Sequence, residues 1–118
     1  MSPIPDIRPL TEEERRLLEW LMAHRSRKAA DYLDQLAKVS VVSRCGCGCP
    51  TIFLTVDGRC GRGGSTILAD FSGVSPEGVL VGVLVHVREE LLSELEVYSM
   101  ADDEGEGGFS LPRVEDLQ

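Results

Sequence analysis

The chain has 118 residues and a formal net charge of −8. A protein with this much negative charge repels the phosphate backbone of nucleic acids, and we therefore expect no nucleic-acid partner. No apolar run approaches the ~18 residues that a membrane-spanning helix needs, so we expect no membrane partner either. The length suits a single domain with its own hydrophobic core. The opening MSPIPDIRPL has no basic leader before an apolar segment, which predicts a cytoplasmic protein with reduced cysteines.

The first 38 residues predict a lead-in followed by helices. Residues 1–10 contain three prolines, which favour an extended segment over the surface. Thr11 then has the pattern of an N-cap, because Glu14 follows at capping-box spacing. A wide leucine stripe predicts that this first helix continues to about His24.

A second helix is expected to end near Lys38. The basic link 24–28 precedes it, and Ser26 is its expected cap. Cations beside helix termini can bind an anion, but they more often only complement the helix dipole. We therefore interpret this link as a solvated corner.

Residues 39–57 predict a β-hairpin that carries three of the four cysteines on alternate positions. Alternate residues of a strand share a face, so Cys45, Cys47 and Cys49 lie together with the valines of the same parity. A chain reversal with an even loop places them on one aliphatic face of the hairpin. Their expected partners, in the same order, are Val56, Leu54 and Ile52.

Two interpretations of the cysteines follow. A thiol on an aliphatic face is usually a small buried hydrophobe, and this is the expected state. The alternative is a thiolate site in which Cys45, Cys47, Cys49 and Cys60 bind Zn or Cu(I), or sense oxidation. The C-x-C spacing in a strand puts neighbouring sulfurs about 6–7 Å apart, so a metal site would require a bent backbone.

The glycine-rich passage 58–65 predicts a connecting loop. It lacks the lysine of a phosphate-binding P-loop, and residues 66–71 predict a strand where that motif requires a helix. Its arginines, Arg59 and Arg62, are the candidate anion contact of this acidic chain.

Two further strands are expected at 79–87 and 93–99, with a connector at 88–92. Pairing them as a hairpin sets His86 opposite Glu94, a candidate acid–base pair. A cross-strand ion pair is the simpler explanation, because the sequence supplies no recognisable nucleophile to complete a catalytic site. We therefore expect a non-catalytic protein.

These elements predict an α+β fold in which two N-terminal helices pack on one face of a roughly five-stranded antiparallel sheet. Residues 100–118 form an acidic loop and a C-terminal segment, and the hydrophobic residues after 108 are expected to dock on the domain.

Three segments resemble a family of small bacterial proteins that has an N-terminal helix, a CGCGCP motif and no known activity. They are RPLTEEE at 8–14, CGCGCPT at 45–51 and LSELEVYS at 92–99. The resemblance implies a bacterial cytosolic single domain and assigns no catalytic residue. The expected function is a binding or interaction module, with a protein partner or a homo-oligomer, and the alternative is the thiolate site.

Overall fold

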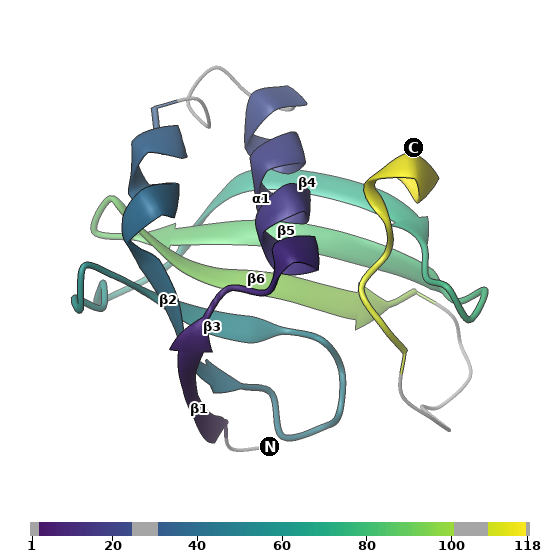
Figure 1. The fold of residues 1–118 in the computed structure, drawn as a ribbon, viewed down its shortest axis with the longest axis horizontal. Helices are drawn as coiled ribbons and strands as arrows, with labels where there is room; N and C mark the ends of the chain where they lie inside the picture. The colour runs from purple at the N-terminus through teal and green to yellow at the C-terminus, as the bar shows by residue number, and fades with distance from the viewer. Residues whose placement is uncertain (1–2, 25–30, 101–108, 118) are drawn as a thin grey trace.

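The computed structural model describes residues 3–24, 31–100 and 109–117, which form a six-stranded antiparallel sheet with helical segments on one face (Figure 1). The strand order is β1-β2-β3-β6-β5-β4. Helix α1 contacts β4 and both 3-10 segments, η1 and η2. The bounds of the elements are β1 Ile4–Pro9, α1 Glu12–His24, η1 Leu33–Lys38, β2 Val39–Arg44, β3 Ile52–Val56, β4 Thr66–Val74, β5 Leu80–Arg88, β6 Leu91–Ser99 and η2 Val114–Asp116.

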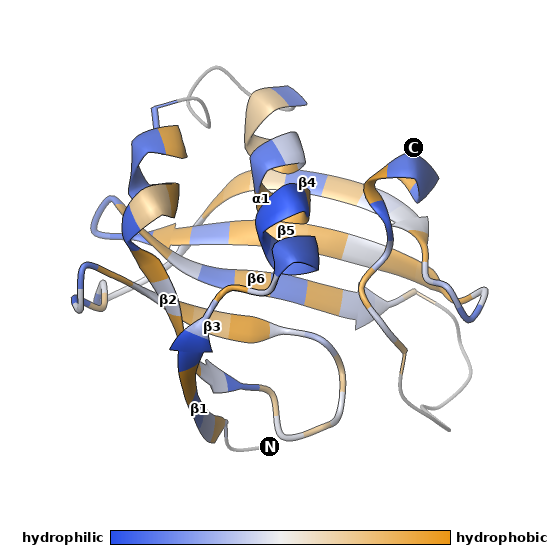
Figure 2. Cartoon of the chain, in the orientation of Figure 1, coloured by the Kyte–Doolittle hydropathy of each residue, from blue (hydrophilic) through white to orange (hydrophobic). Residues whose placement is uncertain are grey.

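The core lies between α1 and the sheet. Hydrophobic residues recur along the central strands of the sheet (Figure 2). Burial alternates along β5, where Val81, Val83 and Val85 are fully buried and Leu84 and His86 are partly exposed. From α1 the core receives Leu17, Leu18, Leu21 and Met22. The α+β class is therefore confirmed, and the face of the sheet that α1 leaves uncovered is available to polar side chains.

The sheet has one strand more than expected, because the proline-rich lead-in is an edge strand. Strand β1 pairs with β2 in a register that sets Pro5 opposite Ser43 and Pro9 opposite Ser40, with a bulge between the two ends. Proline cannot donate a ladder hydrogen bond, so it is tolerated in a strand that has only one neighbour. The lead-in is therefore extended and mostly exposed, and its pairing with β2 is the feature that the sequence did not predict.

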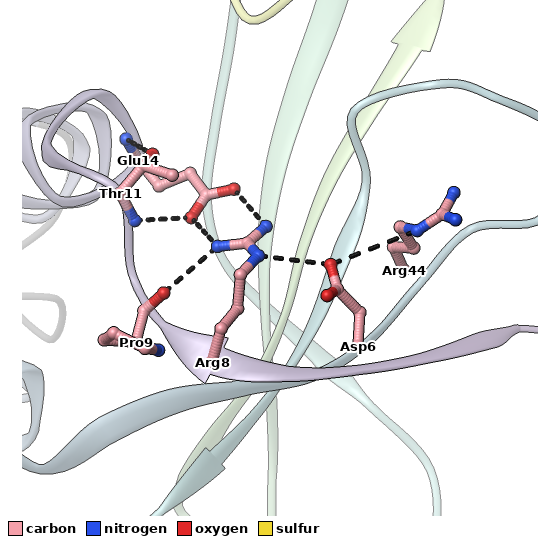
Figure 3. Close-up of polar contacts among 6 residues, drawn as sticks. All are labelled: Asp6, Arg8, Pro9, Thr11, Glu14 and Arg44. Carbon is pink, nitrogen blue, oxygen red and sulfur yellow. Dashed lines mark hydrogen bonds and ion pairs between the residues drawn. The ribbon is translucent and has the colours of Figure 1, made fainter.

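The N-terminus of α1 confirms the capping box and adds an ion pair to it (Figure 3). The Glu14 N–H donates to Thr11 Oγ1 at 3.1 Å, and the Thr11 N–H donates to Glu14 Oε1 at 2.9 Å. Arg8 donates to both Glu14 oxygens, at 2.9 and 3.0 Å. Burial raises the pKa of Glu14, but the hydrogen bonds from Arg8 and Thr11 outweigh it and the pKa is lowered overall.

The expected second helix is instead the 3-10 segment η1, which contributes only Leu36 to the core. Gln35 of this segment holds the β5–β6 turn, because its amide donates to the Glu90 carbonyl at 2.7 Å and accepts the Leu92 N–H at 2.9 Å. The chain then enters β2 directly at Val39. The expected cap at Ser26 and most of the basic link 24–28 lie outside the described residues.

The β2–β3 hairpin forms, but not in the expected register. Val39 pairs with Val56 and Val41 with Leu54, so valines take the places expected for cysteines. This register buries larger apolar side chains than thiols, which favours it. A β-bulge between Val41 and Ser43 then reverses the parity, so that Ser43 pairs with Phe53 on the uncovered face.

The β5–β6 hairpin confirms the expected pairing of His86 with Glu94. Its connector is shorter than expected. Glu89 and Glu90 form the turn with positive φ angles of 51° and 63°, as a two-residue turn of type I′ requires. Strand β6 therefore begins at Leu91, and a bulge after His86 pairs Val87 with Leu92.

Candidate functional site

The cysteine loop, residues 45–51, joins β2 to β3 and is anchored at its ends. The Cys45 N–H donates to the Thr51 carbonyl at 3.1 Å. The Thr51 hydroxyl donates to the Val97 carbonyl at 3.1 Å and accepts the Val97 N–H at 2.9 Å. Thr51 thus ties the end of the loop to β6 by side-chain hydrogen bonds.

Within this loop the three sulfurs converge. Cys45 Sγ and Cys47 Sγ are 3.0 Å apart, and the Cys49 N–H donates to Cys47 Sγ at 3.4 Å. All three sulfurs lie within 4.8 Å of one another. A straight strand would keep them apart, whereas Gly48, at φ 95°, allows the chain to curl.

The expected burial of the cysteines under the helices is wrong. Cys45 and Cys49 are partly exposed and Cys47 is exposed. The bulge in β2 explains this, because it turns the following residues away from the face that α1 covers. Cys60 is exposed and lies outside the sulfur cluster, so the structure brings together three of the four predicted thiols.

Two thiols of the cluster differ in how readily they ionise: Cys47 loses its proton easily and Cys49 does not. Hydrogen bonds from Cys45 and then Cys49 lower the pKa of Cys47 to about 7. Burial raises the pKa of Cys49 to about 11. Near neutral pH a thiolate therefore forms at the most exposed sulfur, where a metal ion or an oxidant can reach it.

A cavity of about 320 Å³ opens between the cysteine loop and the uncovered face of the sheet. The three clustered cysteines and the carboxylates Glu94 and Glu96 contribute to its walls. The remaining lining residues are Thr51, Phe53, Val97, Tyr98, Ser99 and Phe109.

The predicted pair of His86 and Glu94 is part of a larger cluster on this face. His86 Nε2 is 2.7 Å from Oε1 of Glu96 rather than of its direct partner Glu94, and its Nδ1 is 3.2 Å from Ser65 Oγ. Burial raises the pKa of Glu94. Sequence reasoning missed Glu96, although its place two residues along the same face puts it diagonally within reach of His86.

The two loop arginines do not join either cluster. Arg59 is exposed beside a small cavity that Asp34 and Asp57 also line. The Arg62 N–H donates to Glu89 Oε1 at 2.7 Å. The anion contact stays a prediction, and Arg59 has acidic neighbours that would oppose it.

Comparison with protein-family models, curated proteins and solved structures found no match. The family resemblance of the three sequence segments therefore stays a prediction. Among the described residues, no helix combines the length and the apolar character needed to cross a bilayer.

Proposed function

We propose that the chain is a thiolate metal-binding protein whose cysteine loop holds a soft d10 ion, Zn²⁺ or Cu⁺, through Cys45, Cys47 and Cys49. The observation that carries the proposal is the convergence of three sulfurs within 4.8 Å on one loop. Sulfurs bound to one tetrahedral zinc ion are about 3.8 Å apart, given a Zn–S bond of about 2.3 Å. To hold the ion, the loop would separate the Cys45 and Cys47 sulfurs from their 3.0 Å spacing and adjust the Cys49 sulfur, which lies within 4.8 Å of both.

The composition of the site favours soft ions. Thiolates select Cu⁺ and Zn²⁺ over Mg²⁺ or Ca²⁺. Three thiolates complete a trigonal Cu⁺ site, whereas Zn²⁺ takes a fourth ligand, for which water in the adjoining cavity suffices. We also propose a cytoplasmic setting, because a reducing compartment keeps such thiols free. The proposal of a bacterial origin rests on the family resemblance of the three sequence segments alone.

The cavity makes this function better supported than a non-catalytic interaction module. That hypothesis predicts a surface without a cleft lined by titrating groups. Cysteines and two glutamates line one open, shallow cavity, which supports the metal proposal.

Oxidation sensing is a second candidate, favoured by the 3.0 Å spacing of the Cys45 and Cys47 sulfurs. With a peroxide as oxidant, the Cys47 thiolate attacks the O–O bond, becomes a sulfenic acid and releases hydroxide or alkoxide. The Cys45 sulfur then attacks the Cys47 sulfur, and the hydroxyl leaves with the Cys45 proton as water. Mass spectrometry of peroxide-treated protein would show a Cys45–Cys47 disulfide; a persistent pair of free thiols would reject this candidate.

The metal proposal is tested on reduced, chelator-treated protein titrated with Cd²⁺ or Cu⁺. We expect thiolate-to-metal charge-transfer absorption that saturates at one ion per chain, with the stoichiometry confirmed by elemental analysis. Cys47→Ser should abolish this signal. Cys60→Ser is the matched control, because Cys60 is also an exposed thiol but lies outside the cluster. Absence of the signal in the wild-type chain, or equal loss in the control, would overturn the proposal.

A further inference from the structure

A second group of potential metal ligands faces the uncovered side of the sheet, separate from the thiols. It comprises His86, Glu94 and Glu96, whose ligand atoms all lie within 4.8 Å of one another. We propose that these residues form a second metal site, for a divalent ion such as Mn²⁺, Fe²⁺ or Zn²⁺.

The three side chains project from adjacent strands in the interior of the sheet. His86 of β5 lies directly opposite Glu94 of β6, and Glu96 follows on the same face. Strand β6 is hydrogen-bonded between β3 and β5, so the backbone positions of the ligands are fixed. Bonds of about 2.0–2.2 Å from a metal to nitrogen and oxygen place neighbouring ligand atoms about 3 Å apart. The 2.7 Å separation of His86 Nε2 and Glu96 Oε1 is close to that spacing.

The imidazole is oriented as metal-bound histidines are. A ligating histidine commonly donates its second N–H to an oxygen, which fixes the ring and the tautomer. Ser65 Oγ, 3.2 Å from His86 Nδ1, provides that oxygen from the loop before β4. An ion bound at Nε2 would displace the proton of the Nε2–Glu96 hydrogen bond, and Nδ1 would keep its own proton for Ser65 Oγ. The His86 side chain is only 12% exposed, so packing also restricts it.

The charges of the cluster favour a cation. Two carboxylates lie together here, and no described residue donates a hydrogen bond to Glu94, which is partly buried. Arg88 is the nearby cation, but its guanidinium donates to the Gly63 carbonyl at 2.6 Å. A divalent ion would neutralise both carboxylates and bind Glu94 directly, in addition to the electrostatic interaction of Glu94 with His86 and Arg88.

The two sites would select different ions although Glu94 and Glu96 share a cavity with the cysteines. One imidazole and two carboxylates suit Mn²⁺, Fe²⁺ and Zn²⁺, whereas thiolates prefer soft ions. Mn²⁺ is therefore a probe that separates them, because it binds weakly to sulfur.

The experiment measures Mn²⁺ binding through the electron paramagnetic resonance of the free ion. The full chain is compared with a variant that carries Cys45→Ser, Cys47→Ser and Cys49→Ser. We expect saturable binding of one Mn²⁺ per chain in both proteins, so failure of the thiolate proposal would leave this result unchanged. Glu94→Gln should weaken binding by about 10- to 100-fold.

Two further variants keep the test decisive. Glu12→Gln removes an exposed carboxylate of α1 and should bind Mn²⁺ as the wild type does. Glu96→Gln, at a side chain that is 34% exposed, replaces Glu94→Gln if circular dichroism shows that the latter does not fold. Absence of saturable Mn²⁺ binding, or equal affinity in the Glu12 and Glu94 variants, would overturn the second site.

Discussion

Replacing Thr51 with valine tests how the cysteine loop is anchored. The side chain is 5% exposed, and its hydroxyl bonds both the N–H and the carbonyl of Val97, at 2.9 and 3.1 Å. Valine nearly conserves the volume but can neither donate nor accept a hydrogen bond. Thr51→Val therefore leaves two buried backbone groups of β6 without their partner.

The cost can be worked from those two bonds. A buried polar group that loses its partner costs about 1–3 kcal/mol. Because Thr51 is at the end of a loop, water can reach part of the gap, so we expect a total loss of about 2–4 kcal/mol. That is a large share of the roughly 5–15 kcal/mol by which small domains are stable.

Urea unfolding followed by circular dichroism measures this loss. Thr51→Ser is the matched control, because it keeps the hydroxyl and removes one methyl group, at a cost of about 1 kcal/mol. The valine variant should also bind Cd²⁺ more weakly, since the loop is then free at one end. Equal stability of the valine and serine variants would refute the anchoring role of the hydroxyl.

Three further predictions concern other parts of the chain. Arg8→Met removes both guanidinium bonds from the buried Glu14 carboxylate and should cost about 2–4 kcal/mol in urea unfolding at neutral pH. The pKa of Glu14 is lowered in the folded protein, so the difference in unfolding free energy between the variant and the wild type is complete above pH 4.5, the ordinary pKa of this carboxyl group. The difference should fade as the pH falls through the folded pKa of Glu14, and a difference that does not depend on pH would contradict the ion pair. Gly61→Ala places a methyl group against a backbone carbonyl of β5 and should cost about 1–3 kcal/mol. Gly64→Ala, with no described atom within 4 Å, should cost less than about 0.5 kcal/mol, and equal thermal stability of the two variants would count against the close approach. Alkylation of Cys47 in metal-free protein, followed by peptide mass spectrometry, should rise through a midpoint at about pH 7, and a midpoint near 8.5, that of a simple thiol, would contradict it.

The β5–β6 hairpin shows what the sequence could predict about the candidate sites. The alternation of apolar and polar residues fixed which side chains share a face, and His86 does lie opposite Glu94. The register puts both Glu94 and Glu96 within reach of His86, and side-chain rotamers decide that the hydrogen bond goes to Glu96. The alternation pattern therefore predicted where the cluster lies, but we assigned only His86 and Glu94 to it and not Glu96.

The cysteine hairpin shows where the same reasoning failed. A loop with an even number of residues determines which side chains of the two strands share a face. It does not determine which residues pair, because registers shifted by two residues keep the same faces. Valines and cysteines of one parity compete for the same aliphatic partners, and the longer loop lets Val39 and Val41 take them. The bulge beyond Val41 has no clear sequence signature, yet it decides that the thiols face the cavity rather than the core.

The helical and edge segments were misassigned for a related reason. A cap at Ser26 and the spacing of the apolar residues after it predicted a second helix, whereas the contacts of Gln35 with the β5–β6 turn hold a short 3-10 segment at Leu33–Lys38. The prolines of β1 predicted an extended segment but not its pairing, which a sheet edge allows because an edge strand needs only some of the ladder hydrogen bonds. In both cases tertiary contacts outweighed local preference.

The two candidate sites differ in how far their ligands can move, and this difference should govern what each one binds. His86 and Glu94 lie on paired strands, so their backbone positions are set by the ladder, and only side-chain rotation can adapt them to an ion. The cysteines lie on a loop that contains Gly46 and Gly48 and is tied to the sheet mainly through Thr51. Such a loop can adjust its sulfur spacing to trigonal or tetrahedral geometry. We therefore expect the carboxylate cluster to discriminate among divalent ions by size and the cysteine loop to discriminate by softness, so that Cu⁺ and Mn²⁺ should bind together without competing.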